Sequence, residues 1–230
     1  MEMKWLNNVY PKDQYADDYM DSARLMGLIC LFGPVVYSGI YDYHIGNGYL
    51  IRCPIDDQKE SNPKNFSRDQ LICLIAGLSK GNAIYTARSV YHAHKKRWFF
   101  CQNTERDERN TKKKPYPHFY IDDQGYRKFT LFDWADPLMP SDIAHLYLCA
   151  KFPNRFWNSI ARIVVGCGII WHSIFNRNHE NNQIICKAER VGLIEFFKKL
   201  NPYWKRNLFE YWVTDRRDNE VYEIIAKGMA

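Results

Sequence analysis

The stretch from Asp42 to Leu78 constrains the fold more than any other part of the chain. It combines a Gly46-Asn47-Gly48 turn, a short β-prone run and the segment Ser67-Arg68-Asp69-Gln70. Glycine and asparagine tolerate positive φ angles, so the turn is well specified. Ser67 and Gln70 have the spacing of a capping box, in which two side chains satisfy exposed backbone N–H groups. The sequence therefore predicts a helix that begins at this segment and runs to about Leu78.

Apolar residues at helical spacing predict further helices on both sides of that stretch. The first covers about residues 17–32 and ends at Gly33-Pro34, which is a strong stop signal. Residues 35–41 are expected to form a short helix or a strand. One long buried helix is predicted from Asn154 to Phe175. The other helices are expected at about 83–99, 141–150, 182–200, 204–215 and 219–226.

These elements predict a mainly α fold, a compact multi-helix globular domain with a few short β-prone segments. A hydrophobic content of 46% in 230 residues is typical of a folded chain, and we expect a single domain over residues 1–230. From about 101 to 132 the helical pattern fails. Polar residues, prolines and Gly125 predict a long irregular excursion there, with a possible strand at 129–132.

The net charge of +6 is concentrated in one segment of the chain. Between Thr86 and Lys114, nine basic residues stand against three acids, which accounts for the whole excess. The remaining sequence is close to neutral, so composition excludes a uniformly basic surface and indicates one local basic segment. The candidate binding residues in it are Lys95, Lys96, Arg97, Lys112, Lys113 and Lys114.

Cysteine usage and hydropathy bear on location. Seven cysteines occur without any Cys-x-x-Cys pair, and several lie in apolar runs. They indicate reduced thiols packed in the core of a protein made in a reducing cytoplasm. The N-terminal residues lack the basic and apolar regions of a signal peptide. The longest uncharged runs are interrupted or shorter than the ~20 residues of a membrane span, so neither a membrane segment nor membrane binding is expected.

Four residues near the predicted helix start are catalytic candidates if the protein is an enzyme. A carboxylate at a helix start beside arginines suits an acid–base or orienting role. Helix capping explains most of the same segment, and an arginine that pairs with a nearby aspartate would tie the loop down. The structural interpretation is therefore preferred. The candidates are Asp42, Arg52, Arg68 and Asp69.

No metal or cofactor site is predicted. His92 and His94 are two positions apart, and residues at that spacing point in different directions on a helix. We interpret both as solvent-facing side chains beside the basic segment. The glycine motifs that bind nucleotide phosphates are absent, as is the Gly-x-Ser-x-Gly motif of serine hydrolases.

Aromatic residues are interleaved with the two lysine-rich clusters. Trp98, Phe99 and Phe100 follow the first cluster, and Tyr116 and Phe119 follow the second. Cations and rings in this mixture suit a phosphate backbone with stacked bases. A partner protein with an acidic groove fits the pattern equally well.

Several short motifs resemble a set of uncharacterised proteins encoded by tailed bacteriophages. These are the glycine turn, Leu-Ile-Arg-Cys-Pro at 50–54, Asn-Phe-Ser-Arg-Asp-Gln at 65–70, Leu-Ile-Ala-Gly-Leu at 74–78 and the 178–182 segment. The likeness spans about residues 21–217. It implies a viral origin and a role in the virion or during infection, without an activity. The Ser67–Gln70 start is also similar, over four residues, to helical α/α-toroid glycan enzymes.

Three functions follow from these patterns. The leading expectation is a non-enzymatic bacteriophage protein, located in the virion or the host cytoplasm. It would bind another phage or host protein through the 101–132 excursion. The first alternative is a hydrolase that acts on glycan, with Asp42, Arg52, Arg68 and Asp69 around a cavity. The second is nucleic-acid binding through the basic 95–114 segment.

Overall fold

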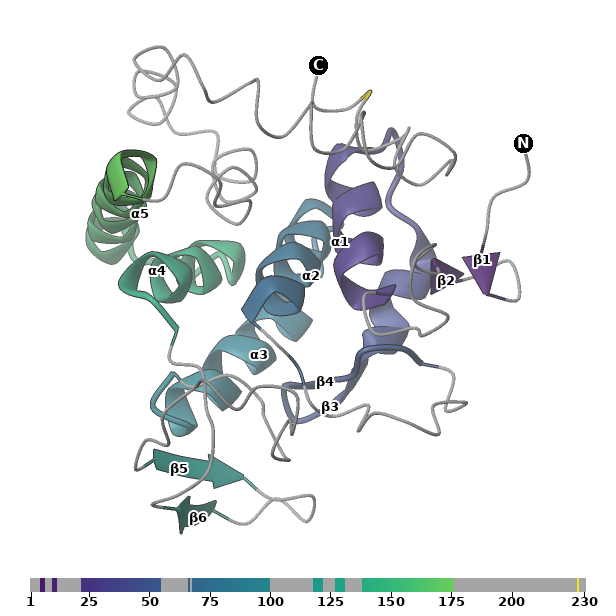
Figure 1. The fold of residues 1–230 in the computed structure, drawn as a ribbon, viewed down its shortest axis with the longest axis horizontal. Coiled ribbons are helices and arrows are strands. Elements are labelled where there is room, and N and C mark those ends of the chain that lie inside the picture. Colours follow the sequence, from purple (N-terminus) through teal and green to yellow (C-terminus); the bar gives the residue numbers. More distant parts are fainter. Residues whose placement is uncertain are drawn as a thin grey trace.

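The computed structural model describes five helices, a 3₁₀ helix and three strand pairs (Figure 1). Within 5–6, 69, 118–121, 127–130 and 169–175 the description covers the backbone alone. The described residues are 5–6, 10–11, 22–54, 66, 68–99, 118–121, 127–130, 138–175 and 227.

The described part of the chain is mainly helical, as the sequence predicts. The helices are α1 (Ser22–Phe32), η1 (Ser38–Tyr43), α2 (Arg68–Lys80), α3 (Ile84–Lys96), α4 (Pro140–Cys149) and α5 (Arg155–Phe175). The strands form three antiparallel pairs: β1 (Trp5–Leu6) with β2 (Tyr10–Pro11), β3 (His44–Gly46) with β4 (Tyr49–Leu50), and β5 (His118–Ile121) with β6 (Arg127–Thr130).

The structure confirms the predicted end of the first helix and the predicted start of the second. Helix α1 ends at Phe32, directly before Gly33-Pro34, and α2 begins at Arg68. The β3–β4 turn has positive φ angles at Gly46, Asn47 and Gly48, as their residue types predict. Within the 101–132 excursion, β6 covers part of the expected strand, and β5 was not predicted. The helices expected after residue 175 lie outside the described residues.

Helices α1 and α2 pack in parallel with their backbones in contact. A Cβ atom on Gly27 would lie 2.3 Å from the carbonyl carbon and oxygen of Cys73, and one on Gly77 would lie 2.8 Å from the Gly27 oxygen. At the other end, Lys80 donates hydrogen bonds from Nζ to the carbonyl oxygens of Leu31 and Gly33, at 3.0 and 2.6 Å. The end of α2 therefore caps the end of α1, which fixes their common direction.

Helix α4 runs in the same direction as α2. Arg68, at the start of α2, pairs with Asp142 in the first turn of α4. After the end of α4, Lys151 donates from Nζ to the Ser79 carbonyl and to Asn82 Oδ1, at 3.2 and 2.7 Å. The start of α2 therefore contacts the start of α4, and the residues after the two helices also contact each other.

Helices α3 and α5 run in the opposite direction. Arg88, near the start of α3, donates to the Ala150 and Lys151 carbonyls beyond the end of α4. The residue before α4, Leu138, donates its N–H to the Phe99 carbonyl beyond the end of α3, at 2.9 Å. Helix α5 returns along α4, because a Cβ on Gly168 would lie 2.5 Å from the Cβ of Ser141.

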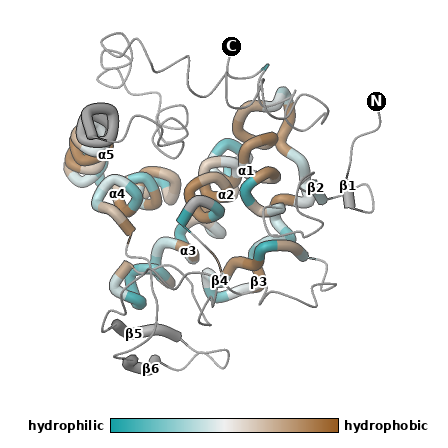
Figure 2. The backbone as a smooth tube through the Cα atoms, in the orientation of Figure 1, coloured by the Kyte–Doolittle hydropathy of each residue, from teal (hydrophilic) through white to brown (hydrophobic). Residues whose placement is uncertain are grey.

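The hydrophobic core lies between α1, α2 and α4. Both α1 and residues 70–78 of α2 are buried almost all round, which is typical of a central helix. Figure 2 shows the hydrophobic residues gathered on these helices and a more hydrophilic α3. Phe66, which precedes α2, is buried in the same core.

The prediction of a fully buried 154–175 helix is wrong for the residues whose side chains are described. Helix α5 lies at the edge of the helical layer (Figure 1), so only one stripe of it faces α4. Ala161 and Val165 are buried in that stripe, and Cys167 is exposed. The other described cysteines, Cys30, Cys53, Cys73 and Cys149, are buried, as the sequence indicates.

Gly27 should tolerate no side chain, because the added methyl group would meet the α2 backbone and not a movable side chain. We expect Gly27→Ala to lower the free energy of unfolding by about 3 kcal/mol, despite the higher helix propensity of alanine. Urea denaturation followed by circular dichroism measures this. Gly81→Ala is the matched control, since its Cβ would meet mainly the ends of the Val36 and Tyr41 side chains. Equal stability of the two variants would contradict backbone contact at Gly27.

Candidate functional site

The buried polar side chains gather toward one end of the helical core, where α1, α2 and α4 begin. Helix N-termini carry unsatisfied N–H groups and partial positive charge, so three parallel helices concentrate both at that end. Helix α3 ends there too, because the Phe99 carbonyl beyond its end accepts a hydrogen bond from the N–H of Leu138, just before α4. The buried polar residues are Ser22, Arg52, Gln70, His94, Arg97, Ser141, Asp142 and His145.

Asp142 is the buried carboxylate at this end. Its two oxygens accept hydrogen bonds from Arg68: Nε is 2.5 Å from Oδ2, and Nη2 is 3.1 Å from Oδ1. Oδ2 also accepts the Met139 N–H at 2.8 Å, which satisfies a backbone donor at the start of α4. A bidentate pair of this kind is strong and directional. Asp142 therefore joins the starts of α2 and α4, and its negative charge offsets their dipoles.

The four catalytic candidates take part in separate contacts, as far as they are described. Arg68 pairs with Asp142, which the sequence analysis did not single out because it lies 74 positions away. Asp42 is exposed on η1, where its Oδ2 accepts the Tyr10 hydroxyl at 2.6 Å. Burial, and then the hydrogen bond to Asp42, raise the pKa of Tyr10 to about 12.

Arg52, the third candidate, is buried, and its carbonyl accepts the Ala23 N–H at the start of α1. The side chain of the fourth, Asp69, lies outside the described part. Ser67, the expected cap of α2, is also outside it. The described contacts of Asp42, Arg52 and Arg68 attach a loop and pair two helices.

The Arg68–Asp142 pair should contribute measurably to stability. We expect Asp142→Ala to lower the free energy of unfolding by about 3 kcal/mol, because it leaves a partly buried guanidinium without its carboxylate. Asp142→Asn retains an oxygen for the Met139 N–H and should recover about 1 kcal/mol, the usual value of a helix cap. Chemical denaturation of these variants, with Arg68→Gln to complete a double-mutant cycle, measures the coupling. Additive losses would contradict a direct pair.

His94 is buried, so the interpretation of His92 and His94 as two solvent-facing histidines is wrong for this residue. His92 is exposed, as expected. His94 Nδ1 lies 2.8 Å from the Val90 carbonyl oxygen, which identifies Nδ1–H as the donor. Arg97 Nη2 lies 3.1 and 3.2 Å from the two ring nitrogens, and its guanidinium carbon is 5.4 Å from the Tyr49 ring centroid. The β3–β4 hairpin therefore contacts this pair through the Tyr49 ring.

Burial, and then the positive charge of Arg97, lower the pKa of His94 well below its usual value. The folded state therefore resists a proton that the unfolded state binds below about pH 6.5. Stability from this group is complete above that pH and is lost as the pH falls toward the folded-state pKa. We expect a loss of about 1.4 kcal/mol between pH 7.5 and pH 5.5, measured by urea denaturation.

His94→Gln should reduce this pH dependence, whatever its effect on stability at pH 7.5. His92→Gln is the matched control, because its exposed ring has no such burial. Burial also lowers the pKa of the half-buried His44, so some pH dependence should remain in both variants. An unchanged slope in His94→Gln would contradict the account of this site.

The basic segment is divided between surface and interior. Lys95 and Lys96 are exposed, whereas Arg97 is buried against His94. Arg97 is therefore not displayed on the surface of this structure. Lys112, Lys113 and Lys114 lie outside the described residues, so their role as binding residues stays a prediction.

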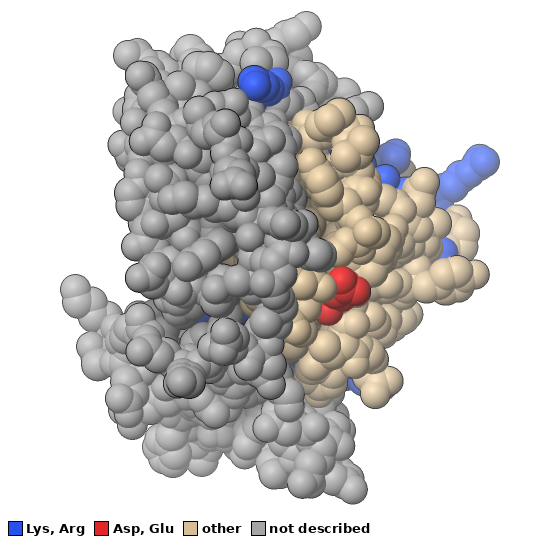
Figure 3. All heavy atoms as spheres, turned by 90° about the vertical axis from the view of Figure 1, so that its right-hand side faces the viewer, with Lys and Arg blue, Asp and Glu red and all other residues tan. Residues whose placement is uncertain are grey.

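The described helical core, residues 22–54, 66, 68–99 and 138–175, is much more basic than the chain as a whole. The net charge of the whole sequence does not reveal the basic charge of this core, because most aspartates and glutamates lie in other segments. On the face drawn in Figure 3 the described acidic atoms form one small patch, and the lysine and arginine side chains lie apart from it, mostly toward the edges of the view. The three acids are Asp42, Asp69 and Asp142, against eleven basic residues: Arg24, Arg52, Arg68, Lys80, Arg88, Lys95, Lys96, Arg97, Lys151, Arg155 and Arg162.

Two exposed helix faces combine these cations with aromatic rings. Tyr85, Arg88, His92 and Lys95 follow one another at helical spacing along α3. Tyr85 is 88% exposed, and Trp98, just after α3, is 64% exposed. We call this stripe together with the exposed start of α5 the basic–aromatic face. Its residues are Tyr85, Arg88, His92, Lys95, Lys96, Trp98, Lys151, Phe152, Arg155, Phe156, Trp157, Arg162 and Ile163.

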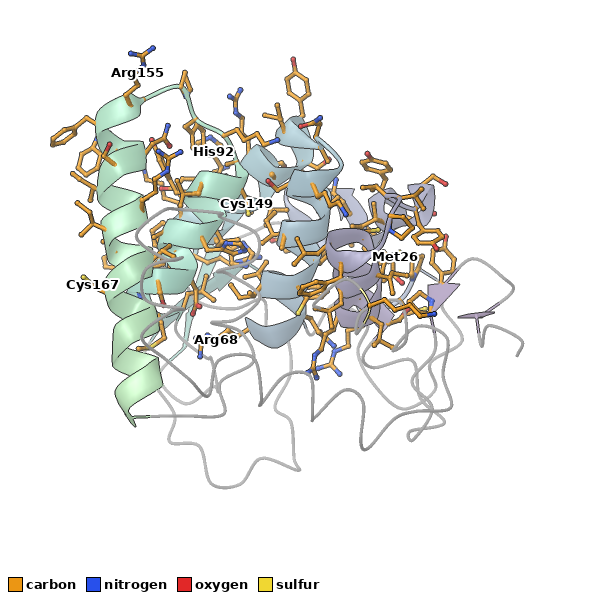
Figure 4. The ribbon with its side chains drawn as sticks, turned by 90° about the horizontal axis from the view of Figure 1, so that it is seen from above. Met26, Arg68, His92, Cys149, Arg155 and Cys167 are labelled. Carbon is orange, nitrogen blue, oxygen red and sulfur yellow. The ribbon has the colours of Figure 1, made fainter. Side chains whose placement is uncertain are left out.

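The Phe152 ring, which lies between α4 and α5, packs against the α3 half of this face. It lies 5.5 Å from the His92 ring and 5.2 Å from the Tyr91 ring, and the Arg88 guanidinium lies over it at 5.4 Å. Figure 4 shows His92 and Arg155 on the same side of the molecule, away from Arg68. His92 and Arg155 therefore lie away from Arg68, whereas Lys95, Lys96 and Trp98 extend this face to the end of α3, beside the buried His94 and Arg97.

The start of α5 exposes large apolar side chains. Phe156, Trp157 and Ile163 are 67%, 53% and 56% exposed. Asn154 accepts the Trp157 N–H at its side-chain oxygen and so caps the helix. Residues 150–175 contain no aspartate or glutamate, so Arg155 and Arg162 have no acidic neighbour on their own helix.

Among the described residues, no group of three or more His, Cys, Asp or Glu side chains is arranged to hold a metal ion. No described helix combines the length and hydropathy that crossing a bilayer requires. Family models, curated proteins and solved structures were each compared with the chain, and none matches. We therefore infer function from the chemistry of the described residues.

Proposed function

We propose that the protein is a non-catalytic binding protein that recognises an anionic macromolecule through the basic–aromatic face. The observation that carries this proposal is the coincidence of exposed rings and exposed cations without a described carboxylate among them. Large exposed apolar side chains on a folded protein usually mark an interaction site. A surrounding positive potential raises the rate at which an acidic partner is encountered.

Four cations on this face are well placed to meet an external anion. Lys95, Lys96, Arg155 and Arg162 are exposed, and within the described residues they make no ion pair or side-chain hydrogen bond. Arg88 and Lys151 differ from them, because their donors already bind backbone carbonyls. We therefore assign the first four to partner contact and the other two to holding the face together.

Catalysis at Asp42, Arg52, Arg68 and Asp69 is less well supported. A hydrolase needs a carboxylate that is placed to exchange a proton with substrate. The carboxylate that Arg68 meets is buried and also caps α4. Bacteriophage origin, a virion or infection-stage role and contact through residues 101–132 stay predictions beside this proposal.

The proposal is tested by binding of labelled polyanions, measured by fluorescence anisotropy over a range of salt concentrations. Oligothymidylate and polyglutamate are suitable probes, because both are polyanions but one carries phosphates and bases and the other carries carboxylates. We expect binding of at least one, with affinity that falls steeply as salt rises. Replacing Lys95, Lys96, Arg155 and Arg162 by glutamine should lower affinity at least tenfold and reduce the salt dependence.

A matched control separates local contact from net charge. Lys95→Gln with Lys96→Gln lowers the net charge by the same amount as Val35→Glu with Ile45→Glu. Val35 and Ile45 are exposed outside the basic–aromatic face. The first pair should weaken binding much more than the second. Equal effects of the two pairs, or binding that does not respond to salt, would contradict the proposal.

A further inference from the structure

The charge of the basic–aromatic face suits any polyanion, but its rings discriminate between classes of partner. We propose that the face binds single-stranded nucleic acid, with bases stacked on its exposed rings and phosphates on the lysines and arginines between them. This inference rests on the proposed function and narrows it to one class of partner.

The exposed rings are the first argument. Phe156 and Trp157 contact each other edge to face, with ring centroids 5.5 Å apart and planes at 70°. That arrangement leaves ring faces open to solvent, as their exposure shows. An unpaired base can stack on such a face, whereas bases inside a duplex are covered by their neighbours.

The shape of the face is the second argument. Along the outer side of α3 its rings are separated by charged residues, whereas Phe156 and Trp157 at the start of α5 lie side by side next to Arg155. A partner helix needs a continuous apolar surface for its apolar stripe. Here the aromatic residues Tyr85 and Trp98 stand at opposite ends of α3, with Lys95 and Lys96 between them. Alternating rings and cations match the repeating base and phosphate of a strand better than they match an apolar stripe.

The spacing along α3 is the third argument. Successive residues of the stripe are three or four positions apart, which is about 5 Å along a helix axis. A stacked strand advances about 3.4 Å per nucleotide. A strand that follows α3 with one nucleotide per step is therefore extended and unstacked. The bases of an unstacked strand are then free to stack on the exposed aromatic rings.

The charge pattern also argues against a second copy of this chain as the occupant. The described face carries cations and no carboxylate, so two such faces would repel each other when brought together. A strand of phosphates has the opposite charge and needs no pocket.

Four probes test the inference: an oligothymidylate of about 16 nucleotides, an abasic strand and a polyglutamate of equal charge, and a duplex of the same length. We expect the oligothymidylate to bind at least tenfold more tightly than the abasic strand. Trp157→Ala and Tyr85→Ala should remove most of that difference, and Trp157→Phe should retain it. Tyr41→Ala is the control, because its exposed ring lies outside the face. Circular dichroism confirms that each variant is folded.

The outcomes separate this inference from the proposed function. Equal affinity for the oligothymidylate and the abasic strand would overturn stacking and leave anion binding intact. Tighter binding of polyglutamate would overturn it in favour of an acidic protein, and tighter binding of a duplex of the same length would overturn the single-strand preference. Failure of every probe to bind would overturn the proposed function as well.

Discussion

The parallel packing of α1, α2 and α4 is the constraint on which the rest of the structure depends. Parallel helices bring their positive ends together, which is unfavourable unless negative charge or acceptors meet them. Asp142 supplies both at the junction of α2 and α4, where it binds Arg68 and the Met139 N–H. At the other end, the lysines Lys80 and Lys151 donate to carbonyl oxygens at the ends of α1 and α2. Close contact at Gly27 then holds α1 against α2.

This arrangement determines which residues remain for a partner. The return helices α3 and α5 pack with one side toward α4, so their other sides face solvent. Arg88 and the ring of Phe152 join α3 to the segment between α4 and α5. Lys95, Lys96, Arg155 and Arg162 make no ion pair or side-chain hydrogen bond within the described residues. The buried charged side chains thus form contacts between helices, whereas the charged side chains on the outer faces of α3 and α5 are exposed to solvent.

Local signals in the sequence predicted the elements well, because turns, caps and helix stops depend on neighbouring residues. The end of α1 at Phe32, the start of α2 and the 46–48 turn are examples. Contacts between segments that are distant in the sequence could not be predicted from such local signals. The partner of Arg68 lies 74 positions away, and the burial of His94 beside Arg97 does not follow from its neighbours in the sequence. Exposure of α5 was missed for the same reason, since an apolar run does not reveal how many neighbours surround it.

Ultraviolet cross-linking of the intact protein to an oligothymidylate, with the attached peptides identified by mass spectrometry, tests the central claim most directly. Nucleobases stacked on aromatic rings cross-link to the residues that they touch. The account predicts adducts within 84–99 and 151–163, on α3 and the start of α5. Adducts confined to the polar end, near Asp42, Arg52 and Arg68, would contradict it, because the binding site would then lie where the helices begin.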